Sequence, residues 1–311
     1  MNTDESPAAT PSSLLRGQWS TGTRCMNDED FNHRITELRP QLHRYCGRMV
    51  GSTVDGEDVL QETLLKAFRA RRAADPPVDN IESWIFRIAH NTSIDFLRER
   101  QRKALEPLPD DIEASPLPER EIATVSFRTF LQLPELQRCA VILKDVVGHS
   151  VEEIAIIADC TPAAAKSALQ RGRANLRKLA AIPEDTRLPL MSEEERQRLV
   201  AYVAWFRAGD FDAIRAMLAE DVKLDLVNRL TLEGRDKVSV YFTRYAEEVR
   251  WRFVFGSIEG NPAILVFDVT GSMQKPSHFV LLEWKQNRVT SIRDFLYAPY
   301  AIETVDWARL N

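Results

Sequence analysis

The chain has 311 residues, of which 44% are hydrophobic and 28% are charged, a composition typical of globular domains. This length predicts two or three domains of roughly 100–150 residues each. The net charge of −5, from 41 basic and 46 acidic residues, excludes a surface coated evenly with DNA-binding charge, although a local basic face would still serve. No apolar run approaches the roughly 20 residues that cross a bilayer.

The first residues, MNTDESPAATPSSLLRGQWS, are polar and rich in proline and serine. They lack the basic start and apolar stretch of a secretory signal, so we expect a disordered tail over 1–27 and a cytoplasmic protein that makes no membrane contact. The four cysteines are widely scattered and form no zinc-ligand spacing, which indicates reduced thiols and no metal site. Cys46, Cys139 and Cys160 are predicted to be small core residues, and a redox sensor is the alternative.

Residues 31–103 are predicted to be almost continuous helix. Apolar residues from Ile35 to Met49 recur at helical spacing, and Pro40 is expected to kink or restart this helix. The segment GSTVDGED is a turn, DVLQETLLKAFRARR is the next helix, and ADPPVDN breaks it. The helix that follows, IESWIFRIAHNTSIDFLRERQRK, ends strongly basic.

Residues 104–121 contain four prolines and many acids, which predicts an extended linker. A second helical unit follows over 122–181. Within it, SVEEIAIIAD and TPAAAKSALQRGRANLRKLA are separated by a turn of the length used in a helix-turn-helix. Ser150 and Glu153 form a capping box, and Thr161 is a good N-cap with Pro162 at the first helical position.

A second linker is expected at 182–191, and the pattern then changes. Helices at about 192–208 and 210–219 precede five segments with the period-two alternation of strands: KLDLV, RWRFVFGSI, AILVFDV, HFVLLEW and VTSIRDFLY. Because helices and strands are segregated, 192–311 is predicted to be an α+β domain with an antiparallel sheet.

Three features point to function. In the second helix of the helix-turn-helix, Ala165, Leu169 and Leu176 are expected to face inward, which turns basic and polar residues toward a DNA groove. The basic end RERQRK follows an aromatic helix, as suits contact with a DNA backbone or unstacked bases. The acidic stripe in DGEDVLQETLLKAF would suit a basic partner. Taken singly, each pattern is also typical of an ordinary solvated helix face.

Together, these segments resemble the extracytoplasmic-function (ECF) sigma factors of bacterial RNA polymerase. DGEDVLQETLLKAFRA resembles the polymerase-binding helix of sigma region 2, and WIFRIAHNTSIDFLRERQR resembles the helix that opens and reads the −10 element. LPELQRCAVILKDVVGHSVEEIAIIADCTPAAAKSALQRGRANLR resembles sigma region 4, which reads the −35 element. The resemblance implies region 2 over 28–103 and region 4 over 122–181, both all-α.

The resemblance also implies partners and roles. The partners are the polymerase core, through the clamp of its largest subunit and its flap, and promoter DNA, and no cofactor or catalysis is expected. The residues expected to meet the clamp are Asp55, Asp58, Gln61 and Glu62. Those expected near the −10 element are Trp84, Arg87, His90, Asn91, Arg98 and Arg100. Those expected at the −35 groove are Lys166, Ser167, Gln170, Arg171 and Arg173.

This chain departs from the family pattern in the helix-turn-helix. The family usually has a glycine near the turn, where Asp159 and Cys160 stand here. It often has a valine at the position of Ala165 and an arginine at that of Ala168. The −35 sequence that this chain reads therefore does not follow from the resemblance.

The C-terminal part resembles the SnoaL-like group of nuclear-transport-factor-like folds through FRAGDFDAIRAMLAEDVKLDLV, LEGRDKVSVYF, IEGNPAILVF and RVTSIRDF. The resemblance implies a cone of curved sheet and helices around a pocket. Asp225, Trp251 and His278 are the leading candidates for a ligand pocket, with Asp268 and Asp294 also placed by alternation. Such a domain is expected to modulate the sigma regions from a short tether, and an unknown small ligand could shift that balance.

Two other functions fit parts of the chain. An enzyme with a DNA-binding adaptor would need paired acid–base groups in the pocket, for which Asp225 and His278 are the candidates. A ligand-sensing helix-turn-helix repressor would explain the last two domains but not residues 31–103. The combination of all three segments favours the sigma factor.

Overall fold

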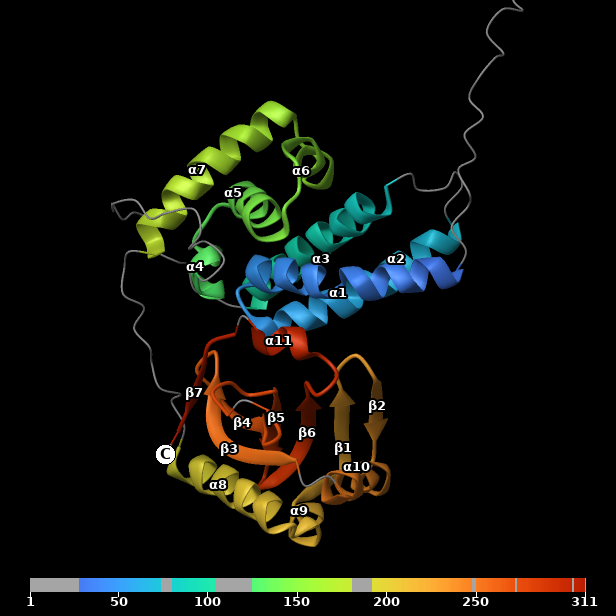
Figure 1. The fold of residues 1–311 in the computed structure, drawn as a ribbon, viewed down its shortest axis with the longest axis vertical. Coiled ribbons are helices and arrows are strands. Elements are labelled where there is room, and N and C mark those ends of the chain that lie inside the picture. Colours follow the sequence, from blue (N-terminus) through green and yellow to red (C-terminus); the bar gives the residue numbers. More distant parts are fainter. Residues whose placement is uncertain are drawn as a thin grey trace, which may run out of the picture.

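The computed structural model describes residues 28–73, 80–103, 125–180, 192–247, 250–271, 273–303 and 305–310. The tail expected at 1–27 and the linkers expected at 104–121 and 182–191 lie outside the described residues. Figure 1 shows the first helices crossing the middle of the molecule, with the second helical unit on one side and the α+β domain on the other.

Three long helices form the first unit: α1 (Asp28–Val50), α2 (Thr53–Ala73) and α3 (Ile81–Lys103). Helix α1 runs through Pro40 without restarting. Helices α1 and α2 cross very closely, since a Cβ atom on Gly56 would lie 2.5 Å from the Cα of Gly47. The tight crossing brings the start of α2 against the end of α1.

The second unit contains α4 (Phe127–Leu131), α5 (Glu135–Val141), a π-helical turn η2 (Ile142–Val147), α6 (Val151–Ile157) and α7 (Pro162–Ala180). The capping box predicted at the start of α6 is present, with the Ser150 hydroxyl and the Glu153 carboxylate each bonded to the other residue's backbone N–H. Thr161 caps α7 as predicted, because its hydroxyl accepts from the backbone N–H of Ala164 at 3.2 Å.

The two helical units share one hydrophobic core. The hydroxyl of Tyr45 on α1 contacts the sulfur of Cys139 on α5 at 3.4 Å, and the Arg138 guanidinium donates to the Met49 carbonyl at 3.0 Å. The ring of Phe86 on α3 packs edge-on against His149, with centroids 4.7 Å apart. The units are therefore packed together rather than separated.

The α+β domain begins with α8 (Glu193–Ala208) and α9 (Phe211–Ala216), and α10 (Arg235–Glu247) and α11 (Pro299–Glu303) follow later. Its strands are β1 (Leu218–Leu226), β2 (Leu230–Glu233), β3 (Trp251–Ile258), β4 (Asn261–Asp268), β5 (His278–Lys285), β6 (Arg288–Asp294) and β7 (Trp307–Arg309). The α+β class is confirmed.

The strands form one sheet in the order β2-β1-β6-β5-β4-β3-β7. The expectation of an antiparallel sheet was wrong at one pair, because β1 runs parallel to β6. The chain reaches β6 only after α10 and several intervening strands, so β1 and β6 need no tight turn between them.

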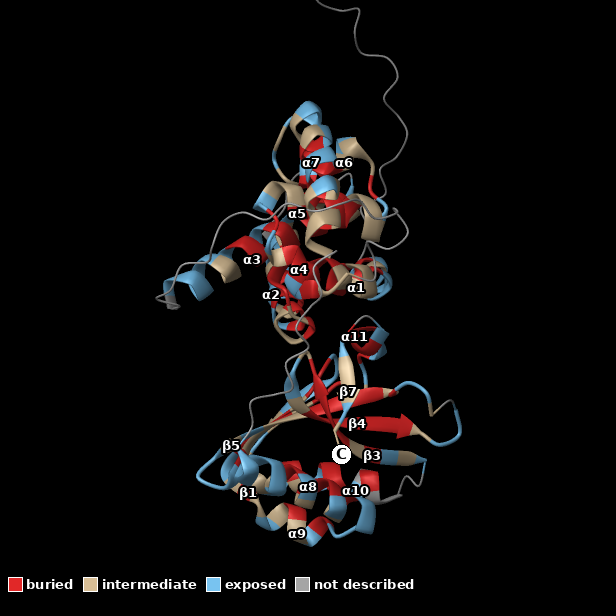
Figure 2. Cartoon of the chain, turned by 90° about the vertical axis from the view of Figure 1, so that its left-hand side faces the viewer, coloured by how far each residue is buried: buried red, intermediate tan, exposed pale blue. Residues whose placement is uncertain are grey.

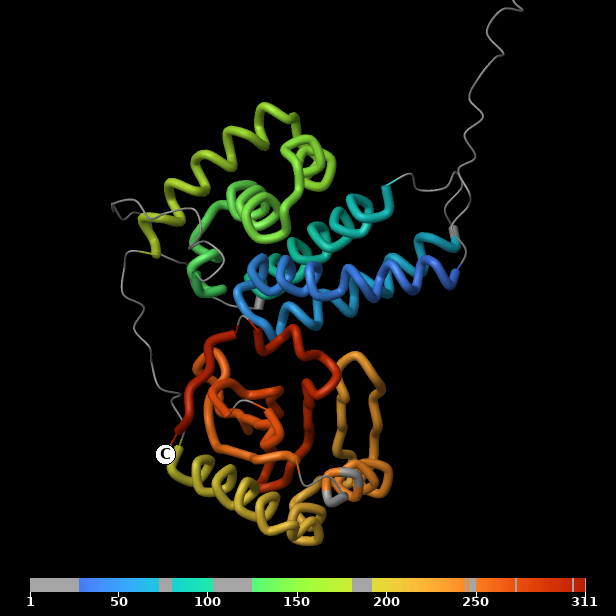
Figure 3. Tube along the Cα trace, in the orientation of Figure 1, coloured from blue at the N-terminus to red at the C-terminus, as the bar shows by residue number. Residues whose placement is uncertain are grey.

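The two faces of the sheet carry different cores. On β4, Ile264 and Val266 pack with α8, α9 and α10, whereas Leu265 and Phe267 pack on the opposite face, as the period of two requires. Figure 2 shows this arrangement from the side, with α8–α10 below the sheet and α11 between the sheet and the first helical unit. Figure 3 traces the same path of the chain as a tube. Of the helices described, none is long and apolar enough to span a membrane.

Candidate functional site

The outer face of α7 carries exposed basic and polar side chains. Ala165, Leu169 and Leu176 are buried as predicted, and Ala168 joins them. The predicted groove residues Lys166, Gln170 and Arg171 are exposed, and Ser167 is half-buried. Arg173 differs, because it makes two hydrogen bonds to Asp145, one of them 3.0 Å from Nε to Oδ2. This pair fixes α7 against η2 and leaves the more N-terminal side chains of α7 to solvent.

The turn before α7 shows how an aspartate can stand where the family usually has a glycine. Asp159 has φ of 51°, the left-handed conformation that favours glycine and that aspartate tolerates better than most residues. The backbone shape expected of the turn is therefore kept with a different residue. The carboxylate of Asp159 also accepts a hydrogen bond from Nη2 of Arg87 on α3 at 3.1 Å.

The residues of α3 expected near the −10 element fall into two groups. Asn91, Arg98 and Arg100 extend away from the core, and Arg100 lies 3.3 Å from the Asp55 carboxylate on α2. The other group packs inward. His90 is buried and its Nδ1 lies 2.9 Å from the Tyr45 hydroxyl, and burial lowers its pKa to about 4. Trp84 is packed against the shared core.

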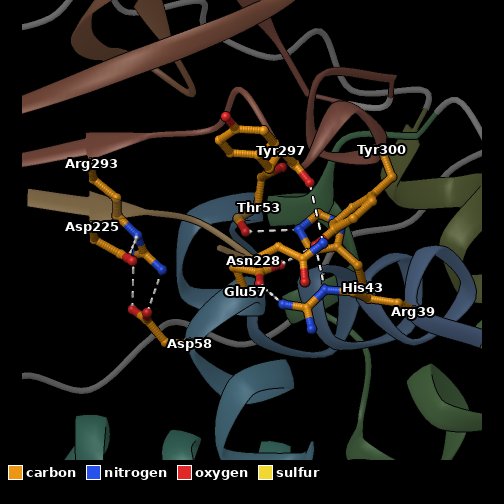
Figure 4. Close-up of polar contacts among 10 residues, drawn as sticks. All are labelled: Arg39, His43, Thr53, Glu57, Asp58, Asp225, Asn228, Arg293, Tyr297 and Tyr300. Carbon is orange, nitrogen blue, oxygen red and sulfur yellow. Dashed lines mark hydrogen bonds and ion pairs between the residues drawn. The ribbon is translucent and has the colours of Figure 1, made fainter. Parts of the chain in front are cut away.

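One residue of the acidic stripe on α2, Asp58, contacts the C-terminal domain. Asp58 forms a two-pronged ion pair with Arg293 on β6, and its Oδ2 lies 3.2 Å from Nη1. The Nε of Arg293 lies 3.3 Å from Oδ2 of Asp225 on β1, so one guanidinium joins two carboxylates (Figure 4). Gln61 and Glu62 lie farther along α2, where Glu62 is exposed.

A buried polar network lies beside this pair. The Tyr300 hydroxyl on α11 donates to Glu57 at 3.0 Å and accepts from Nε of Arg39 at 2.8 Å. Arg39 also bonds Glu57 directly at 2.6 Å. Burial raises the pKa of the fully buried Glu57 carboxyl, and the Arg39 charge opposes that shift. The Tyr300 ring packs on His43, with centroids 4.9 Å apart, so α11 meets α1 and α2 in both polar and ring contacts (Figure 4).

The residues predicted to line a pocket in the C-terminal domain lie in two separate places. Trp251 and His278 are in edge-on ring contact at 5.0 Å, and His278 lies 3.1 Å from the Tyr245 hydroxyl. That hydroxyl and the Tyr241 hydroxyl both donate to the fully buried Asp294 at 2.8 and 2.7 Å. The structure thus brings His278 together with Asp294, whereas Asp225 lies on the opposite side of the sheet with Arg293.

Alternation along β6 explains this division. Arg293 and Asp294 are adjacent, so their side chains leave opposite faces of the sheet. The sequence carried this signal for Asp294, but it did not reveal Arg293 or Tyr300. Asp268, the remaining candidate, accepts from the backbone N–H and hydroxyl of Thr270 at 2.9 and 2.6 Å, in a turn.

The described cysteines are poor sensors. Cys46 and Cys139 are buried and Cys160 is partly exposed. Burial raises the pKa of all three thiols, that of Cys139 to about 12. Because the thiolate is the reactive form, these positions favour the prediction of core residues over the redox alternative. Cys25 lies outside the described residues.

Comparison with known proteins places each part of the chain. Sigma-70 region 2 matches residues 34–103, Sigma-70 region 4 matches 128–176, and the SnoaL-like domain matches 199–294. The chain is similar to the ECF RNA polymerase sigma-E factor of Escherichia coli, with 31% identity over 159 residues that cover 46% of this chain and 82% of that protein. The chain belongs to the ECF sigma factors.

One relative spans all three parts. The ECF RNA polymerase sigma factor SigG of Mycobacterium tuberculosis is 26% identical over 301 residues, covering 86% of this chain and 81% of that protein. Among solved structures, extracytoplasmic function sigma factor SigJ of Mycobacterium tuberculosis has 16% identity and a TM-score of 0.34, covering 85% of this chain and 95% of that one.

Family membership settles the general activity. This ECF sigma factor directs transcription initiation, which involves the RNA polymerase core and promoter DNA. The prediction that the chain is not an enzyme is confirmed by the family, not by the geometry of the C-terminal domain. Asp225 and His278, the acid–base pair named for an enzyme with a DNA-binding adaptor, are not brought together, because they lie on opposite faces of the sheet.

Proposed function

We propose that this ECF sigma factor rests in a closed form that its C-terminal domain stabilises by occupying the polymerase-binding helix α2. In this closed form regions 2 and 4 share one core and the C-terminal domain is docked on α1 and α2. The observation that carries the proposal is the pairing of Asp58 with Arg293. Asp58 is one of the residues expected to meet the polymerase clamp, and one side chain cannot pair fully with two partners at once.

The surroundings of Asp58 support competition rather than a passing contact. Arg293 already neutralises Asp225, so its charge is held in place between two carboxylates. Next to it, Val54 of α2 packs on the apolar face that carries α11, and Tyr300 completes the bonds of Glu57. A polymerase subunit that approached this part of α2 would have to displace the C-terminal domain first.

The DNA-contacting surfaces support the same proposal. His90, expected near the melted −10 strand, is buried with its Nδ1 on Tyr45 of α1, and Trp84 is partly buried against the core that regions 2 and 4 share. Arg87 is paired with Asp159 of region 4. Arg87 could therefore meet a DNA phosphate without competition only after region 4 moves away. By contrast, Lys166, Gln170 and Arg171 on α7 are exposed in the closed form, and we propose that they contact the −35 element.

In vitro transcription with core polymerase tests the proposal. The Arg293→Ala variant frees Asp58 without altering any residue assigned to polymerase or DNA. We expect it to bind core more tightly and to initiate at lower concentration than the parent chain. Arg252→Ala is a matched control, because Arg252 is an exposed arginine of the same domain. Equal core affinity for the parent chain and Arg293→Ala would contradict the proposed modulation while leaving the family assignment intact.

A ligand for the C-terminal domain is a separate part of the proposal. The buried set of Asp294, Tyr241, Tyr245 and His278 lies on the face of the sheet away from α2. Arg293, the preceding residue on β6, makes the contact with α2. A small molecule that displaced the tyrosine hydroxyls from Asp294 would therefore act on the strand that docks the domain, provided that it binds the docked and free forms unequally.

A further inference from the structure

The turn between β3 and β4 touches both sigma regions at once. Its two residues, Glu259 and Gly260, connect the paired Ile258 and Asn261. The carboxylate of Glu259 accepts a hydrogen bond from the backbone N–H of Thr53, the first residue of α2, at 2.6 Å. Its carbonyl oxygen accepts from Nη2 of Arg128 on α4 at 2.8 Å. One residue of the C-terminal domain thus bonds region 2 through its side chain and region 4 through its backbone.

The bond to α2 is favourable for reasons of helix structure. The first N–H groups of a helix have no partner within the helix, and the N-terminus carries a partial positive charge that attracts a carboxylate. Ser52 caps the N–H of Asp55 at 3.2 Å, which leaves the N–H of Thr53 for Glu259. Burial raises the pKa of the Glu259 carboxyl, while the bonds to Thr53 oppose that shift.

Region 4 reaches the same point from the other side. Gly51, in the turn before α2, has φ of +78°, and a Cβ atom there would collide with Cδ1 of Leu131 on α4. Helix α4 therefore presses on the α1–α2 turn where Glu259 caps α2. Arg128, one turn of helix earlier than Leu131, reaches from α4 to the Glu259 carbonyl.

Glu259 occupies a turn position that other residues suit better. Glu259 and Gly260 have φ of 51° and 75°, as in a two-residue turn with both residues left-handed. Such turns strongly prefer Asn-Gly or Asp-Gly. A glutamate is unfavourable there, and a residue held in an unfavourable conformation directs attention to a function outside the local fold.

We infer that the β3–β4 turn is a contact surface that binds region 2 and region 4 together and so helps to hold the two sigma regions against each other. The inference rests on the closed form described under the proposed function. It adds that the C-terminal domain acts on the contact between regions 2 and 4 in addition to covering α2. The partner of the turn is the junction of the α2 N-terminus with α4.

Hydrogen exchange on the full chain without polymerase tests this inference. The Glu259→Asn variant places the preferred Asn-Gly pair in the turn, so the hairpin should be at least as stable, while the shorter side chain cannot reach Thr53. We expect the Thr53 amide to exchange about tenfold faster, because a hydrogen bond to a charged group is removed. The amides of α4 should stay protected in this variant, because the carbonyl that binds Arg128 belongs to the backbone and is kept. Glu259→Gln, which keeps the length and removes the charge, should show a smaller acceleration.

Arg128→Ala is the matched variant for the other half of the contact. It should accelerate exchange in α4 and leave the Thr53 amide protected. If Glu259→Asn exposes the Thr53 amide but Arg128→Ala leaves α4 unchanged, the turn binds region 2 alone and the bridge is refuted. If neither site changes, the whole contact is refuted. Faster exchange in both places without any gain in transcription would preserve the bridge and contradict the proposed modulation.

Discussion

Removal of one hydroxyl group should loosen the C-terminal domain from α1 and α2. The Tyr300 hydroxyl donates to Glu57 and accepts from Arg39 in a site where Glu57 is fully buried. Hydrogen bonds to charged groups contribute ~1.5–3 kcal/mol each. Tyr300→Phe removes both bonds, but the direct Arg39–Glu57 pair remains and still neutralises the two charges. We therefore take about 2 kcal/mol for the whole hydroxyl, which weakens docking by about 30-fold.

The apparent affinity for core polymerase measures this change. If the closed form predominates, the dissociation constant for core should fall by up to about 30-fold in Tyr300→Phe, since the open fraction rises by that factor. The ring contact with His43 is kept by phenylalanine. Tyr297→Phe is the control, because Tyr297 lies in the same segment with 38% exposure. Equal dissociation constants for the two variants would refute the docking energetics.

Three further changes probe other contacts. Asp58→Arg should abolish core binding, and adding Arg293→Asp should restore docking, measured as lower protease sensitivity, but not transcription; recovery of transcription would contradict the role of Asp58. Lys166→Ala with Arg171→Ala should reduce promoter binding and lower the salt slope by about 1 for each phosphate that is no longer neutralised, measured by affinity at several salt concentrations; an unchanged slope would remove α7 from the interface. Burial lowers the pKa of His43 to about 4, below ~6.5 for the unfolded chain. Stability from neutral His43 is therefore complete above pH 6.5 and is lost as the pH falls toward 4, by up to about 3 kcal/mol; urea unfolding of His43→Gln should show a weaker dependence on pH than the parent chain, because His90, whose pKa is also lowered to about 4, keeps its own contribution.

Features set by neighbouring residues could be predicted from the sequence. The capping box at Ser150, the N-cap at Thr161 and the buried face of α7 depend on residues within one or two turns. The bounds of α3 also follow from local pattern, because a proline-containing break precedes Ile81 and a proline-rich stretch follows Lys103. The order of the three motifs was sufficient for the family.

Features set by distant residues could not be predicted in this way. Alternation placed Asp225 on a strand, but nothing local told which face would meet α2 or that Arg293 would stand opposite. His90 has the residue type of a base-contacting group, yet its partner is Tyr45, 45 positions earlier. The parallel pairing of β1 and β6 likewise depends on the path of the chain between them.

A tethered domain does not need tight contacts to control this sigma factor. Across a short linker the effective concentration is on the order of millimolar. A docking contact with a dissociation constant of ~0.1 mM between the separated domains would then give about ten closed chains for each open one. Core affinity would then be lowered by the same factor and no more. The contacts made by Arg293, Tyr300 and Glu259 all stabilise the same closed form, so each shifts the same equilibrium between closed and open chains. Variants that remove them should therefore add only until the chain is open, and a combined variant should bind core no more tightly than a chain that lacks the C-terminal domain. Core affinity beyond that limit would mean that the substitutions create new polymerase contacts, and competition for α2 would not explain them.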